Sequence, residues 1–417
     1  MNRITTTTLD CGTPLVVERI AGVRSVSLTW LIPAGTASEP ADRLGIAGIW
    51  AELLMRGAGA RRSRELADAL DRLGLARSTD AGGTHLRLAA TTTGDRLADS
   101  LPILADMVLR PRMDEDAIEP TRDLALQSLE SLADDPHERA AVAARDRHFP
   151  TPFNRSPHGS REGIEAVTRD DLLRGWAERA RPGGCIVAIA GDADADAAAR
   201  VLNRELKGWS GAAPAPRPVG TPPRGYQHET DETNQVQIIL VHDAPPEPDP
   251  RSILERVAVS VLSGGMAGRL FTEVREKRGL CYAVHAGYSS GKEFGAVSAD
   301  VGTTPERAQE SLNVVVSELK RMMGPVSSGG GILREEFDRA IVGMKSRLVF
   351  SGESTGARAG ALAYDLHRIG RARGLDELEA EIAGVTLDAV NAYLASRSLG
   401  RVTIQTLGPA PLTPPAS

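Results

Sequence analysis

Apolar and polar residues alternate along several short segments of this chain, and that period-two pattern predicts β-strands. Strands are expected at 14–18, 26–32, 85–91, 185–190, 235–241, 295–301 and 401–406. Elsewhere apolar residues recur every three or four positions, which predicts amphipathic helices. Helices are expected near 43–56, 95–109, 114–133, 136–147, 250–262, 305–322 and 334–349. Strand hairpins grouped with runs of helices, without strict alternation, favour an α+β fold.

A segment rich in Pro and Gly, GAAPAPRPVGTPPRG at 211–225, divides the chain into two parts of similar length. We therefore expect an N-terminal domain at 1–210, a linker at 211–225 and a C-terminal domain at 226–417. The two parts also echo each other, because 64–82 can be laid without gaps on 269–287. Both segments predict a short helix that ends at a glycine, Gly74 or Gly279, and is followed by a strand. The sequence thus predicts two homologous α/β-sandwich domains that arose by duplication.

Composition narrows the functional classes. The 417 residues are 41% hydrophobic and 25% charged with a formal net charge of −6, and no basic stripe suggests a nucleic-acid partner. Three cysteines, scattered and odd in number, argue against a disulfide framework and favour a reducing compartment. There is no long apolar run to span a membrane and no apolar core of a signal peptide near the start. We therefore expect a protein of the bacterial cytoplasm with no membrane partner.

Two segments carry the candidate chemistry: GIAGIWAELLMRG at 45–57 and SGGMAGRLFTEVREKRGLCYAV at 263–284. Together they resemble the insulinase/pitrilysin (inverzincin) family of zinc metallopeptidases, which writes the first segment as G-[IL]-A-H-F-L-E-H-M-L-F-[KR]-G. In that family two histidines bind zinc from one face of a helix, and the glutamate between them activates the metal-bound water. The resemblance implies two similar α+β domains joined by a linker over nearly the whole chain.

The zinc motif is kept here in outline only. The family's first histidine falls on Gly48, its glutamate on Ala51 and its second histidine on Glu52. Glycine offers no ligand, alanine cannot activate water, and a single carboxylate cannot replace a pair of histidines. The ordinary alternative for Glu52 is a solvated or salt-bridged residue on a helix surface, and we favour it.

The family's third zinc ligand is also missing. It is a glutamate eight residues before the proline of an acidic-acidic-proline turn, which falls on Ser128 because the turn here is DDP at 134–136. A shift of one or two residues offers Gln127 or Glu130, but two carboxylates without histidine or cysteine make a poor zinc site. We expect this chain to bind no metal, and any zinc to reside in a partner subunit.

The second segment, in contrast to the first, keeps the functional residues that the family has at these positions. The resemblance implies that Arg275 and Tyr282, seven residues apart in VREKRGLCY, hold the substrate backbone and stabilise the oxyanion of the tetrahedral intermediate. An Arg donor and a phenolic O–H on rigid elements suit such a role. The structural alternative is a charged helix with a glycine C-cap, followed by a tyrosine in the core. Agreement of the flanking residues favours the functional interpretation.

These features lead to one leading hypothesis and one rival. The first is the metal-free subunit of a heterodimeric peptidase, like the mitochondrial processing peptidase or its bacterial two-subunit relatives. It would be inactive alone, but would supply Arg275 and Tyr282 to a homologous partner that bears H-x-x-E-H and cleaves unfolded peptides. The rival is a catalytically inactive scaffold or peptide-binding pseudopeptidase. A self-sufficient homodimer with a displaced metal site ranks last, because ligands are lacking.

Overall fold

The chain folds into two compact units in a computed structural model, which describes the structure of residues 3–414. The first unit comprises Met1–Ser131, Pro150–Gly220 and Ser351–Gly374, and the second comprises Leu132–Phe149, Thr221–Phe350 and Leu375–Ser417. One passage from the first unit to the second lies between Gly220 and Thr221, and each unit also includes a helical segment from the other half of the sequence.

The first unit is built on a six-stranded mixed sheet. Its strand order is β1-β2-β8-β3-β7-β6. The bounds are Arg3–Thr8 (β1), Pro14–Arg19 (β2), Ile186–Gly191 (β8), Ser25–Ile32 (β3), Leu86–Thr93 (β7) and Ala76–Ala81 (β6). A small hairpin, β4 (Gly57–Ala58) with β5 (Arg61–Arg62), lies outside this sheet. The parallel pair β2–β8 and the antiparallel pairs around β3 give the sheet its mixed character.

Seven helices from the first half of the sequence belong to this unit. They are α1 (Ile46–Leu53), α2 (Ser63–Arg72), α3 (Leu97–Leu109), α4 (Glu115–Ala133), α6 (Arg161–Ala166), α7 (Arg169–Arg179) and α8 (Ala195–Glu205). The larger core of the unit brings together Trp30, Trp50 and Trp176, which are almost fully buried. Trp50 and Trp176 meet edge to face at 5.9 Å, so α1 and α7 are locked by aromatic packing.

The second unit repeats the sheet of the first with one strand fewer. Its order is β11-β12-β10-β13-β9, with bounds Cys281–Ser290, Gly295–Thr303, Val236–Ala244, Thr403–Gly408 and Gly225–Thr230. From β6 to β2, the first sheet has three antiparallel pairs followed by one parallel pair. The second sheet has the same order from β11 to β9, and it lacks a counterpart of β1. Its helices are α9 (Ser252–Ser263), α10 (Ala308–Met323), α11 (Arg334–Gly352), α13 (Leu375–Ala383) and α14 (Leu387–Ser396).

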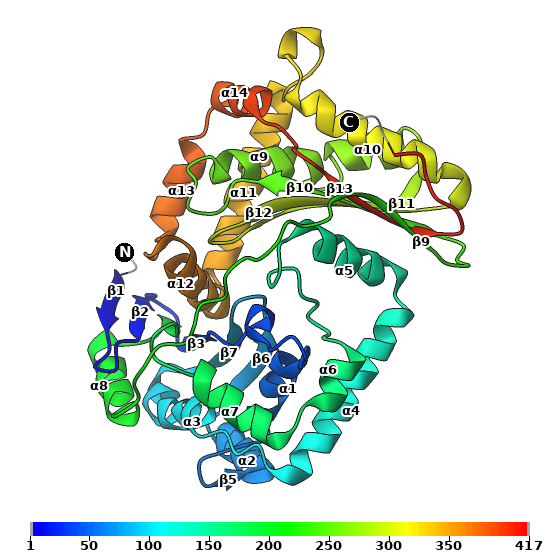
Figure 1. Cartoon of the computed structure of the whole chain (residues 1–417). Helices are drawn as coiled ribbons and strands as arrows, with labels where there is room; N and C mark the ends of the chain where they lie inside the picture. Colours follow the sequence, from blue (N-terminus) through cyan, green and yellow to red (C-terminus); the bar gives the residue numbers. More distant parts are fainter. Residues whose placement is uncertain (1–2, 415–417) are drawn as a thin grey trace. The chain divides into compact units, whose positions relative to one another are not determined.

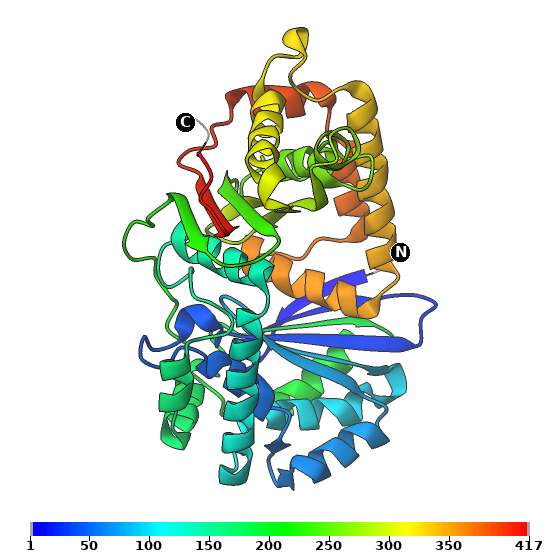
Figure 2. The same ribbon diagram turned by 90° about the vertical axis from the view of Figure 1, so that its right-hand side faces the viewer.

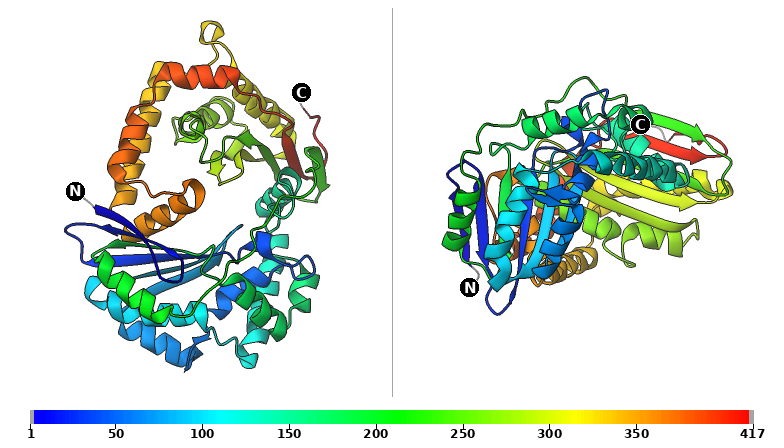
Figure 3. Two further views of the ribbon diagram at one scale, coloured as in Figure 1. Left: turned by 60° about the vertical axis from the view of Figure 1, so that its left-hand side comes forward. Right: turned by 90° about the horizontal axis from the view of Figure 1, so that it is seen from below.

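One helix in each unit comes from the other half of the sequence. In the first unit, α12 (Thr355–Ile369) covers one sheet face through Ala359, Leu362 and Ala363, and the remaining helices cover the other face (Figures 2 and 3). In the second unit, α5 (Pro136–His148) packs Ala140 and Ala144 on β10 and β13, opposite α9 and α10 (Figure 1). Both sheets are therefore covered on both faces.

The fold bears out the α+β prediction and the internal repeat. Gly74 and Gly279 have φ of 58° and 60°, so each ends its helical segment in the left-handed conformation that favours glycine. Two expectations need correction. The helix near 43–56 is shorter, Ile46–Leu53, because Gly45 before it takes a left-handed φ of 107°. The segment before Gly279 contains a π-helix, Phe271–Glu276, where an ordinary helix was expected.

Candidate functional site

Helix α1, which carries the zinc-motif positions, is fixed at its first turn by a buried carboxylate. Glu39 Oε1 accepts hydrogen bonds from the backbone N–H of Gly45 (3.1 Å) and of Ala47 (3.0 Å). These bonds satisfy amide groups that a helix N-terminus leaves unpaired. Burial nevertheless raises the pKa of the Glu39 carboxyl to about 7, against the lowering effect of the same backbone bonds and of Arg155.

The three motif positions on α1 offer no zinc ligand set. A Cβ added to Gly48 would meet no atom within 4 Å, so the place of a first histidine is open. Ala51 is buried, and its carbonyl accepts a hydrogen bond of 2.7 Å from the Thr79 hydroxyl. Glu52 Oε1 accepts from Arg56 Nε (3.0 Å) and Nη2 (2.8 Å). The one carboxylate at the motif is thus engaged in an i,i+4 ion pair.

The positions on α4 do not complete a metal site either. Ser128 Oγ lies 3.4 Å from His158 Nδ1, and Glu130 forms an ion pair of 2.8 Å with Arg161. Zinc prefers thiolate, imidazole or free carboxylate ligands. The positions described here offer instead a serine hydroxyl, an alanine side chain and two carboxylates that are paired with arginines. Within residues 3–414 no group of three or more His, Cys, Asp and Glu is arranged to hold a metal ion. The residues present therefore do not fit the family's metal.

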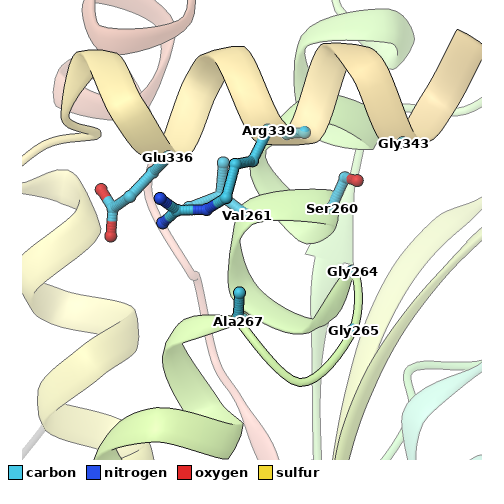
Figure 4. A pocket seen from close by; sticks show the side chains of 10 residues that line it. Ser260, Val261, Gly264, Gly265, Ala267, Glu336, Arg339 and Gly343 are labelled. Atoms are coloured by element: carbon cyan, nitrogen blue, oxygen red, sulfur yellow. The ribbon is translucent and has the colours of Figure 1, made fainter.

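The segment that carries Arg275 is anchored in the second unit by Arg269. This guanidinium, 4% exposed, donates to Glu336 on α11 at 2.6 Å through both Nε and Nη2, and to the carbonyl of Gly331. Of the preceding glycines, Gly264 is close-packed, because an added Cβ would lie 2.2 Å from the Ser260 carbonyl oxygen, whereas a Cβ on Gly265 would meet nothing within 4 Å. A pocket of about 60 Å³ remains between α9, this loop and α11 (Figure 4). The loop is thus held rigidly against α11.

Arg275 and Tyr282 lie at two backbone irregularities and meet each other. Arg275 is in the π-helix, and Tyr282 is the extra residue of a β-bulge between Cys281 and Ala283, where β11 slips by one position against β12. The Arg275 guanidinium carbon lies over the Tyr282 ring, 5.4 Å from its centroid. π-Helical turns and bulges occur often at functional sites, where they redirect side chains. Tyr282 is 83% exposed, so the alternative of a core tyrosine is wrong.

Charges around this pair leave Arg275 without a carboxylate partner in the described part of the chain. Glu273, two residues earlier, binds Lys277 Nζ at 2.7 Å and Arg278 Nη1 at 2.8 Å. Hydrogen bonds from these two cations lower the pKa of Glu273, which stays ionised and occupied. Arg275 is therefore free to donate hydrogen bonds to a carbonyl or carboxylate oxygen from outside the chain.

Comparisons with known proteins show which family this chain resembles over most of its length. Residues 15–151 match the family model described as Insulinase (Peptidase family M16), and 166–341 match the Peptidase M16 inactive domain. Uncharacterized zinc proteases of Mycobacterium leprae and Mycobacterium tuberculosis are 27% and 28% identical. These alignments cover 97% and 95% of this chain, and 91% and 92% of the relatives.

Solved structures show the same fold. A protease from Helicobacter pylori superposes with a TM-score of 0.87 at 17% identity, covering 98% of this chain and 100% of the other. A peptidase M16 inactive domain from Pseudomonas fluorescens gives 0.84 at 20% identity over 100% of both chains. The two repeated sheets and these likenesses define a duplicated α+β protein with the fold of the M16 peptidases. The chain belongs to the insulinase family, peptidase family M16.

Two side chains near these positions were not singled out from the sequence. Phe271 is the ring under Arg275, at 4.8 Å from its guanidinium carbon to the ring centroid, and the four-residue spacing between them was the available signal. Glu39 lies too far from α1 in sequence for a conventional capping pattern to find it.

In residues 3–414 no helix is long and apolar enough to cross a membrane.

Proposed function

We propose that this chain is the metal-free subunit of a heterodimeric zinc peptidase of the insulinase family. Its partner would be a homologous chain bearing H-x-x-E-H, which supplies the zinc, and its substrates would be unfolded peptides. Arg275 and Tyr282 would donate hydrogen bonds to the substrate backbone and to the oxyanion that forms at the scissile carbonyl. Alone, the chain would bind no zinc and cleave no peptide.

One observation carries the proposal: an exposed Arg275–Tyr282 pair is retained by a chain whose zinc positions are Gly48, Ala51 and Glu52. Neither burial nor an ion pair accounts for the two side chains, because Tyr282 is 83% exposed and Arg275 has no carboxylate partner within residues 3–414. Donors aimed at developing negative charge belong to acyl-transfer sites. Such donors are useful here only where another chain provides the nucleophilic water.

The test is reconstitution with a homologous H-x-x-E-H chain from the same genome, followed by an assay of peptide cleavage with and without a chelator. Arg275→Ala should lower kcat of the complex about 10²-fold, the scale of losing one oxyanion donor. Arg334→Ala is the matched control, because Arg334 also lies over an aromatic ring, at 5.8 Å from Phe337, but is outside the motif. Normal assembly with undiminished cleavage by the Arg275 variant would refute the role.

The second candidate is a scaffold or peptide-holding protein without turnover in any complex. It is favoured by the loss of every zinc position, and by a TM-score of 0.83 at 17% identity to a chain of complex III2 from Candida albicans, a likeness of fold alone. A scaffold gains nothing from free donors at Arg275. If the chain binds an unfolded peptide but no reconstituted pair cleaves it, this second function replaces the first.

A further inference from the structure

We propose that Phe271 is a positioning residue for Arg275: its ring holds the guanidinium in place while leaving the N–H donors free. This inference rests on the proposed function for its catalytic consequence, but its structural content concerns the isolated chain. Ring and cation both belong to one turn of the second unit, so nothing outside that turn and β11 is needed to form the contact.

The geometry places the Arg275 guanidinium carbon over two rings. It lies 4.8 Å from the centroid of Phe271 and 5.4 Å from that of Tyr282, both inside the range of a cation–π contact. Phe271 and Arg275 are four residues apart, the spacing at which helical side chains become neighbours. Phe271 is the shorter contact of the two, and it is half-buried, whereas Tyr282 is exposed. Phe271 is therefore the better-fixed of the two rings.

An arginine stacked on a ring differs from an ion-paired arginine in how many of its N–H donors remain available for hydrogen bonds. An ion pair with a carboxylate consumes the N–H donors, whereas a ring contacts the face of the guanidinium and leaves its edge free. The nearby carboxylate that would compete, Glu273, is held by Lys277 and Arg278. The Glu273 carboxylate of this turn is thus kept from pairing with Arg275, and aromatic rings orient the Arg275 guanidinium. This arrangement suits the binding of a carbonyl oxygen by Arg275.

The base of the turn is rigid enough for this positioning to be effective. Val274 is fully buried in the core of the second unit, between the two residues of the stack in sequence. Arg269, just before Phe271, is bound through two nitrogens to Glu336. A ring mounted on such an anchored segment loses little rotamer freedom when it stacks, so its contact with Arg275 persists on the time average.

The test measures kcat and KM of the reconstituted complex for Phe271→Leu, Phe271→Tyr and Arg275→Ala, and for the double variant Phe271→Leu/Arg275→Ala. A surface cation–π contact predicts about a 2- to 5-fold fall in kcat for the leucine variant with little change in KM. Tyrosine, which keeps the ring, should restore the wild-type value. On the Arg275→Ala background, leucine should cause no further loss, because the ring then has no cation to hold.

Tyr364→Leu is the matched control for removing an aromatic ring. Its ring lies under Arg368 at the same four-residue spacing, 5.0 Å from the guanidinium carbon, on α12 of the other unit. This variant should leave kcat unchanged. An equal fall in kcat for both leucine variants, or an additive loss in the double variant, would overturn the inference by showing that the ring acts through general stability.

A measurement on the isolated chain separates this inference from the proposed function. In protein labelled with ¹⁵N-arginine, the Nε–Hε signal of Arg275 should report restricted motion and a ring-current shift, both lost in Phe271→Leu and kept in Phe271→Tyr. If no complex cleaves peptide but this signal responds as expected, the proposed function fails and the positioning stands. If Arg275→Ala impairs cleavage but Phe271→Leu changes neither signal nor kcat, the positioning is wrong.

Discussion

Replacement of Glu39 by glutamine should remove the part of the pH dependence of stability that this buried carboxyl gives the first unit. The carboxyl is 4% exposed, and burial raises its pKa from 4.5 to about 7. The folded protein therefore binds one more proton than the unfolded chain between these two values, and wild-type stability falls as pH rises through that window. Glutamine resembles the protonated form and keeps a carbonyl oxygen for the amides of Gly45 and Ala47.

The size of the effect follows from proton linkage. One pKa unit corresponds to about 1.36 kcal/mol, and the shift to about 7 gives an expected loss of about 2 to 3 kcal/mol between pH 5 and pH 8. Against this background Glu39→Gln should gain about that much over wild type at pH 8 and little at pH 5. Because other carboxyls titrate in both proteins, the difference between the two proteins isolates Glu39.

Urea unfolding at pH 5, 6, 7 and 8 measures this difference, with amide exchange of Gly45 and Ala47 as a local probe of α1. Glu52→Gln on the same helix controls for the loss of one negative charge, because the Glu52 side chain is 44% exposed. A constant difference between Glu39→Gln and wild type over this pH range would refute the reasoning, since it would mean that Glu39 is ionised in the folded protein throughout.

Three further changes test the anchoring of the helices. Arg269→Ala removes one partner of a buried ion pair and leaves Glu336 uncompensated, so the free energy of unfolding should fall by about 3 kcal/mol in urea titration. Gly264→Ala places a Cβ 2.2 Å from the carbonyl oxygen of Ser260 and should lower thermal stability by about 1 to 3 kcal/mol. Gly360→Ala in α12, where an added Cβ meets nothing within 4 Å, should be neutral or stabilising by up to about 1 kcal/mol. Equal effects of the two glycine variants would contradict the packing argument.

Much of the fold could be predicted because many of its strands and helix ends follow from patterns of a few neighbouring residues. Alternating residues marked the central strands, and Gly74 and Gly279 marked the same helix end in both repeats. The assignment of α5 and α12 to sheets could not be predicted, because amphipathic spacing says that a helix has an apolar face but not which sheet that face covers. Six helices were not predicted from the sequence at all: α6, α7, α8, α12, α13 and α14.

The candidate site could be predicted in part. Spacing and flanking residues were enough to single out Arg275 and Tyr282, and the zinc positions on α1 could be recognised as unsuited to metal. The π-helix and the β-bulge were hidden, because each shifts the backbone register by a single residue without a composition that marks it. The pairing of Phe271 with Arg275 has the four-residue spacing of helical neighbours, but this spacing is common to many residue pairs and did not by itself single out Phe271.

The exchanged helices have a consequence for how the chain acquires its structure during synthesis. Arg358 on α12 forms a buried ion pair with Glu18 on β2, 340 residues earlier in the chain. The first sheet therefore emerges from the ribosome long before helix α12. That helix covers the sheet face on which Val16, Leu31 and Ile186 lie. Until residue 369 is made, that apolar face has no cover of its own. The covering helix α12 is therefore made only after strands β9 to β12 of the second unit, and cutting the chain within 211–225 would place each sheet and one of its own helices on different fragments.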